Sequence, residues 1–292
     1  MTALLDLMFG PYALTLLILV SVNTTLAASL NLITGYAGQV SIGHAAFYAI
    51  GAYAAGLLFK TFGWGFWLTL PSAALMSFAA GLVIGAPSLR VEHDFLAIVT
   101  LGLGLVVQGL ALNLEFTGGP YGIAGVPRIS AFGREFGLWG YAATGVALAA
   151  VTLLVVYRIT RARPGTALMA VREDPLAAEV IGINTSRYKI LAFATGALFA
   201  GAAGSLYAHY ATFVGHDSFG LGTSIAIMSM VVVGGLGRLW GPVVGAVLLT
   251  LIPELIRFTA AYRMFLYGLL LVVTMRYMPQ GLLGALAQRK PR

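Results

Sequence analysis

Runs of about twenty apolar residues recur along this chain of 292 residues, and they decide what it can fold into. A helix rises about 1.5 Å per residue, so about twenty residues cross the hydrocarbon core of a bilayer. Membrane-spanning strands would instead appear as alternating segments of about ten residues. Charged residues make up only 9% of the chain, compared with about 25% in soluble domains. The sequence therefore predicts an all-α, polytopic membrane helical bundle surrounded by membrane lipid.

We predict about nine transmembrane helices, within a range of eight to ten because glycine interrupts several segments. They cover residues 11–33, 42–60, 66–86, 94–115, 138–158, 190–211, 222–235, 241–258 and 264–284. The densest positive charge lies in residues 158–189 and in the C-terminal tail, and loops rich in arginine and lysine remain in the cytoplasm. Counting back through five spans then places the N-terminus outside and the C-terminus in the cytoplasm. The net charge of +7 comes from such loops, so no nucleic acid is expected as a partner.

Residues 158–189 are the one long charge-rich stretch, with six basic residues and three acids. Asp174 followed by Pro175 is typical of a helix N-cap and the first helical residue. Leu176, Val180 and Ile183 follow at spacings of four and three and form an apolar stripe. This loop is therefore expected to hold a short amphipathic surface helix.

Two apolar segments are interrupted by glycine and are expected to be broken helices. The first holds the candidate pathway residues Asn31, Gly35, Gly38, Gln39, Ser41 and His44, and the second holds Gly234, Gly235 and Gly237. Aligning Gly35 with Gly234 also places Gly38 on Gly237, which indicates two structural repeats. Broken helices at matched positions often mark a transport pathway, because protein or a watery cavity must satisfy the unwound backbone. For Gln39 and His44, lining the pathway and bonding between helices both remain open.

Several kinds of active site are excluded or disfavoured. ATP hydrolysis would require a glycine-rich loop ending in Gly-Lys-Ser/Thr, and none of the three lysines follows a glycine. The chain has no cysteine, which excludes thiol catalysis and cysteine-ligated zinc. His209, His216 and Asp217 are too few to predict a metal site. We therefore expect no enzyme, no metal and no cofactor on this chain.

The loop helix resembles the docking helix of permeases from bacterial ABC importers, whose loose signature is Glu-Ala-Ala, three residues, then Gly. Ala177, Ala178 and Gly182 match that spacing, with Leu176 in place of the glutamate. The candidate ATPase-coupling residues are Arg172, Glu173, Asp174, Pro175, Ala177, Ala178, Glu179 and Gly182. The alternative is an ordinary solvated loop helix.

A broader resemblance covers about residues 28 to 284. It is carried by NLITGYAGQVSIGHAAFYAIGAY, TGGPYGIAGVP, RARPGTALMAVREDPLAAEVIGIN, SMVVVGGLGRLWGPVVGA and the late YMPQGLLG. Together these segments are similar to the branched-chain amino acid ABC transporter permease family, and most similar to its M-type subunit. The resemblance implies a single inner-membrane permease domain that alternates its access. It also implies an H-type permease partner, two subunits that bind ATP and magnesium, and a periplasmic binding protein.

The sequence leaves alternatives open for the solute that is transported and for the energy source. Similar permeases handle branched-chain or other amino acids, and relatives carry urea, amides or aromatic acids, so the residues do not select among these solutes. The wider superfamily includes ribose-type permeases. A rival from another mechanistic class is an ion-coupled secondary transporter or channel, although few acids lie within the predicted spans.

Overall fold

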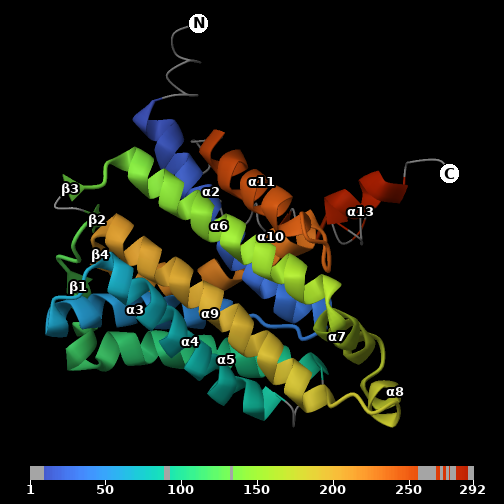
Figure 1. Ribbon diagram of the computed structural model, residues 1–292. Coiled ribbons are helices and arrows are strands. Elements are labelled where there is room, and N and C mark those ends of the chain that lie inside the picture. Colours follow the sequence, from blue (N-terminus) through green and yellow to red (C-terminus); the bar gives the residue numbers. More distant parts are fainter. Residues whose placement is uncertain are drawn as a thin grey trace, which may run out of the picture.

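The computed structural model describes residues 10–88, 93–131, 134–255, 268–269, 272–273, 276 and 281–288. Figure 1 shows long helices packed side by side as a bundle. The helices are α2 (Pro11–Asn31), α3 (His44–Phe62), α4 (Phe66–Ser88), α5 (His93–Asn113), α6 (Leu138–Arg161), α7 (Arg163–Glu173), α8 (Pro175–Val180), α9 (Thr185–Ala211), α10 (Leu221–Gly234), α11 (Gly241–Leu255) and α13 (Gly281–Gln288). Shorter turns are the π-helix η1 (Leu32–Tyr36) and the 3-10 helices η2 (Glu115–Thr117), η3 (Gly119–Tyr121) and η4 (His216–Phe219).

The predicted helical bundle is confirmed, and seven helical segments of the described chain are long and apolar enough to cross a membrane. They are Pro11–Tyr36, His44–Phe62, Phe66–Gly85, Phe95–Asn113, Leu138–Arg161, Thr185–Ala211 and His216–Gly234. The eighth predicted span corresponds to α11, a shorter apolar helix. The ninth, 264–284, lies largely outside the described residues, as do residues 1–9 and the basic tail 289–292.

Small residues let α9 pack at the centre of the bundle against α3 and α4. A Cβ atom built on Gly51 of α3 would lie 2.2 Å from the backbone oxygen of Gly201, and one on Gly204 would lie 2.2 Å from that of Tyr48. Glycine at these positions therefore permits direct contact between helix backbones. On the other side of the bundle, α2 lies between α6 and the pair formed by α10 and α11.

Four short strands add to the helices at one end of the bundle. The strands β1 (Ile123–Ala124) and β4 (Phe213–Val214) pair antiparallel, and β2 (Ser130–Ala131) pairs with β3 (Arg134–Glu135). They were not expected from the sequence, because two-residue strands leave no periodic pattern. They lie at the opposite end of the bundle from α7 and α8 (Figure 1).

The charge-rich stretch 158–189 contains more helix than the sequence analysis expected. The helix α6 runs on to Arg161, and α9 begins at Thr185 rather than near residue 190. An additional helix, α7, lies before the predicted short helix, which is α8. Consequently Arg172 and Glu173 belong to the last turn of α7, whereas the other candidate coupling residues lie in α8 or at its ends.

Candidate functional site

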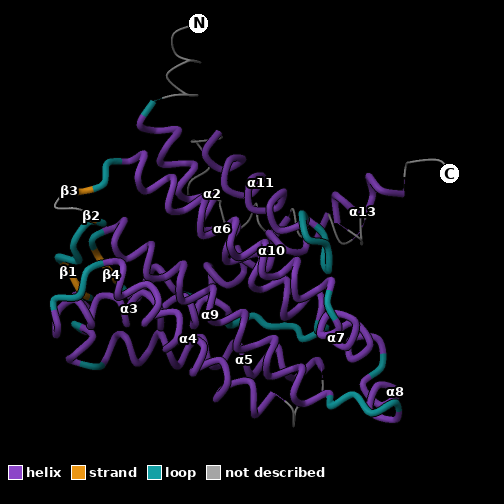
Figure 2. Tube along the Cα trace, viewed as in Figure 1, coloured by secondary structure: helices purple, strands orange, loops and turns teal. Residues whose placement is uncertain are grey.

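Two helix breaks form the candidate site, and Figure 2 draws both as interruptions by loop. At the first break, α2 passes into the π-helix η1, then into an irregular stretch, and α3 starts at His44. At the second, α10 ends at Gly234 and α11 starts at Gly241. Gly38 and Gly237, matched by the sequence alignment, have φ angles of 71° and 70°. Both glycines therefore adopt the left-handed conformation that other residues rarely tolerate.

The two breaks contact each other directly, although they lie about two hundred residues apart in the sequence. Asn31 is buried at the end of α2, and its Oδ1 accepts a hydrogen bond of 2.9 Å from the Gly237 backbone N–H. Its Nδ2 donates a bond of 3.0 Å to the Arg238 carbonyl. A Cβ atom on Gly35 would lie only 2.4 Å from the Gly237 nitrogen. One amide side chain thus ties the first break to the second.

The polar residues of the first break are buried, and several contacts hold them in place. His44 Nε2 and Ser29 Oγ are hydrogen-bonded at 2.8 Å, and the Thr34 hydroxyl donates to the Gln39 carbonyl at 3.1 Å. Ser41 Oγ and His44 Nδ1 have no hydrogen-bond partner within the described residues. These side chains therefore shape the break, and two of their polar atoms make no hydrogen bond to the described residues.

Neighbouring helices also fix the backbone of the first break. The Ile42 N–H donates to Thr100 Oγ1 of α5 at 3.0 Å, and the Ala45 N–H donates to Ser224 Oγ of α10 at 3.2 Å. These hydroxyls replace bonds that a continuous helix would provide for itself. The sequence analysis did not identify Thr100 or Ser224, since nothing in their own segments marks them.

The helix α8 has the predicted caps. The Asp174 carboxylate accepts hydrogen bonds from the backbone N–H groups of Leu176 and Ala177 at 2.9 and 3.1 Å, and Pro175 is the first helical residue. At the other end, Gly182 has a φ angle of 85° and turns the chain out of the helix. The predicted N-cap and first helical residue are therefore confirmed.

The outer face of α8 is apolar and exposed. Leu176, Val180 and Ile181 are 76%, 88% and 73% exposed. Ala178, by contrast, is buried, and the Glu179 carboxylate accepts a hydrogen bond from the Thr185 hydroxyl at the start of α9. Two exposed apolar side chains on the six-residue helix and a third on the residue that follows it form a surface suited to a protein partner. We call Leu176, Val180 and Ile181 the α8 surface.

Arg172, in the last turn of α7, connects the helices α7 and α8 to the first break. Its Nη1 donates a hydrogen bond to the Gly35 carbonyl, 137 residues away in the sequence. Arg172 and its neighbour Glu173 are both exposed. The structure thus places Arg172 against the first break rather than on the α8 surface.

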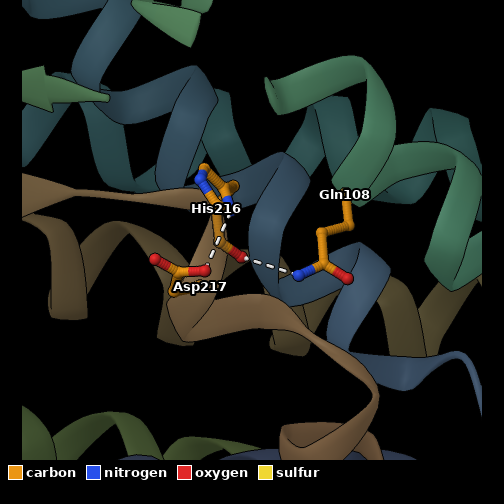
Figure 3. Close-up of polar contacts among 3 residues, drawn as sticks. All are labelled: Gln108, His216 and Asp217. Atoms are coloured by element: carbon orange, nitrogen blue, oxygen red, sulfur yellow. Dashed lines mark hydrogen bonds and ion pairs between the residues drawn. The ribbon is translucent and has the colours of Figure 1, made fainter. Parts of the chain in front are cut away.

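At the strand end of the bundle, the polar groups have structural contacts. Figure 3 shows Gln108 reaching from α5 to η4, where its Nε2 donates to the His216 carbonyl at 3.5 Å. His216 Nδ1 and Asp217 Oδ1 lie 3.1 Å apart. His209 is buried, with Nε2 2.8 Å from Thr69 Oγ1 and Nδ1 2.7 Å from the Pro127 carbonyl. Both ring nitrogens of His209 are therefore used in holding α4 and the strand end to α9.

Replacing His209 by phenylalanine is expected to destabilise the protein. His209→Phe keeps an aromatic ring but leaves the part-buried Pro127 carbonyl and the buried Thr69 hydroxyl without this partner, a loss of about 1–3 kcal/mol. The measurement is thermal unfolding in detergent. His216→Phe is the matched control, because it removes only a pair whose Asp217 partner is exposed, and a change within about 0.5 kcal/mol is expected. Equal effects of the two changes would contradict the assignment.

Comparison with known proteins identifies the family of this chain. The family described as the branched-chain amino acid transport system permease component matches residues 12–275. The chain belongs to this family. It is 39% identical to the high-affinity branched-chain amino acid transport system permease protein LivM of Escherichia coli, over 88% of this chain and 67% of that protein. The LivM protein of Salmonella typhimurium gives the same values.

A second kind of permease is related more distantly. The LivH permease protein of the same transport system in Escherichia coli is 29% identical over 48% of this chain and 45% of that protein. No solved structure matches the chain. The family assignment confirms the resemblance drawn from the sequence, and the permease is an integral membrane protein with several spans.

Proposed function

We propose that this permease is the M-type transmembrane subunit of an ABC importer and carries branched-chain or closely related amino acids into the cell. The observation that carries this proposal is the 39% identity to LivM permeases over most of the chain. The protein lies in the bacterial inner membrane and is not an enzyme. The entire chain forms one permease domain of about nine spans, with its N-terminus outside, its C-terminus in the cytoplasm and residues 158–189 as a cytoplasmic coupling loop.

The proposed assignment to an ABC importer implies three kinds of partner protein. The relatedness to LivH supports an H-type permease as the second transmembrane half. Two further subunits would bind ATP and magnesium, since no lysine of this chain follows a glycine as a phosphate-binding loop requires. A periplasmic binding protein would select the solute, so the permease itself need not bind it tightly.

The mechanism is alternating access driven from the cytoplasmic side. The basic residues of α6, α7 and α9 support a cytoplasmic position for α8, because arginine and lysine are retained there. The α8 surface would enter a cleft of an ATPase subunit and move with it. The paired breaks would then rearrange, because their backbone is held by side-chain bonds rather than by a continuous helical ladder.

Uptake of labelled solutes tests this function. Cells that lack the endogenous system and express the full importer should take up labelled leucine in an ATP-dependent manner, and excess isoleucine or valine should compete. Competition by urea, an amide or an aromatic acid instead would assign another solute. Uptake by this chain alone in vesicles with an ion gradient would replace the proposal by an ion-coupled carrier.

A further inference from the structure

Arg172 occupies a place where the cytoplasmic helices meet both helix breaks. It lies in the last turn of α7, two residues before the Asp174 cap of α8. Its Nη1 donates to the Gly35 carbonyl in η1. Carbonyl groups in the last turn of a helix lack helical partners and carry partial negative charge, so a guanidinium is a favourable donor to them. The contact therefore joins α7 to the end of the α2–η1 segment.

The side chain of Arg172 is exposed on one side and lies against glycines from both breaks on the other. A Cβ atom on Gly38 would lie 2.8 Å from Arg172 Cγ and 3.2 Å from its Cα. One on Gly237 would lie 2.9 Å from Arg172 Nη1. These are the two glycines with matched positive φ angles, one in each break. Glycine at both positions thus leaves the space that the arginine fills.

The contacts make one connected unit. Arg172 holds Gly35 and borders Gly237, while Asn31 bonds to the Gly237 N–H from the other side. A displacement of α7 would therefore act on the first break through the hydrogen bond and on the second through the close approach of the guanidinium to Gly237. A surface arginine with a purely solvating role would show neither contact.

We propose that Arg172 is the positioning residue that transmits movement of α7 and α8 to both helix breaks at once. This inference rests on the proposed function, in which α8 docks on an ATPase subunit. Arg172 itself acts behind the docking surface: it sets the position of the breaks and does not hold the ATPase.

The experiment uses the complete importer in proteoliposomes and compares Arg172→Met with Arg172→Lys. Three quantities are measured: co-purification of the ATPase subunits, ATP hydrolysis, and solute transported per ATP. For Arg172→Met we expect normal co-purification, continued hydrolysis and at least a tenfold fall in solute per ATP. Arg172→Lys keeps a cationic donor and should restore part of the coupling. Arg163→Met, which removes an exposed arginine at the start of the same helix, should leave all three quantities unchanged.

Other results would overturn the inference. Loss of ATPase co-purification in Arg172→Met would assign the residue to docking, and unchanged solute per ATP would remove it from coupling. Equal loss of folded protein in the Met and Lys variants, measured by thermal unfolding, would make Arg172 a purely structural tie. Failure of the proposed function has a different signature, since the wild-type importer would then show no ATP-dependent uptake at all.

Discussion

Val180→Asp is expected to detach the ATPase subunits and abolish ATP-dependent uptake. Val180 is 88% exposed at the end of α8, between two other exposed apolar side chains of the α8 surface. If α8 enters a cleft of an ATPase subunit as proposed, a carboxylate there would have to lose its hydration. Truncation or charging of a central interface side chain costs about 2 kcal/mol or more, which weakens association at least about thirtyfold.

The measurement is co-purification of the ATPase subunits with the permease from solubilised membranes, followed by uptake in cells. Tyr121→Asp is the matched control, because Tyr121 is 87% exposed but lies in η3, two residues before β1. Co-purification should survive that change. If Val180→Asp also retained the ATPase subunits and uptake, α8 would be an ordinary solvated helix.

Local patterns in the sequence were sufficient to predict the elements that depend on neighbours in the chain. The α8 cap depends only on Asp174, Pro175 and the residues that follow, so its residue types identify it. The breaks were predicted in the same way, from glycines that interrupt apolar runs. The alignment of Gly38 with Gly237 also matched two residues of the same backbone conformation, because their φ angles are nearly equal.

The helix α7 was missed because its apolar side is short. Ala167, Leu168 and Val171 are buried, but charged residues flank them on both sides and they begin soon after Pro164 and Gly165. These two residues usually indicate a turn. The burial of this side against the rest of the bundle stabilises a helix that local sequence does not identify.

The start of α9 was placed too late for a related reason. Arg187 and Lys189 were assigned to the loop, yet both lie within the first turns of the helix. Long basic side chains can extend from a helix end towards water while their methylene groups cover apolar surface. Charge therefore marks the membrane boundary better than it marks the helix end.

Contacts between distant segments could not be predicted from one sequence. The Asn31 bond to Gly237 joins positions 206 residues apart, and the Arg172 bond to Gly35 joins positions 137 residues apart. The sequence predicts separate roles for the two residues: Asn31 is a candidate for the transport pathway, and Arg172 is a candidate for coupling to the ATPase. Only their common contact with the breaks combines them into one site.

Gly35→Ala is expected to separate the two breaks and cause a severe loss of transport. A Cβ atom at Gly35 would lie 2.0 Å from Asn31 Oδ1 and 2.4 Å from the Gly237 nitrogen. The asparagine side chain can move aside, but the Gly237 backbone can move only if the second break shifts. Overpacking of this kind costs about 1–3 kcal/mol, so the thermal unfolding temperature in detergent should fall together with uptake.

Gly102→Ala is the matched control, because a Cβ atom there meets nothing within 4 Å and the residue lies inside α5. It should be neutral or stabilising by about 0.5–1 kcal/mol, the usual helical preference for alanine over glycine. The double change Asn31→Ala with Gly35→Ala, compared with Asn31→Ala alone, then separates the two causes. It removes the side-chain clash and leaves the 2.4 Å approach to Gly237, so uptake should stay low. Recovery of uptake in the double variant would show that the backbone contact between the breaks is not the constraint.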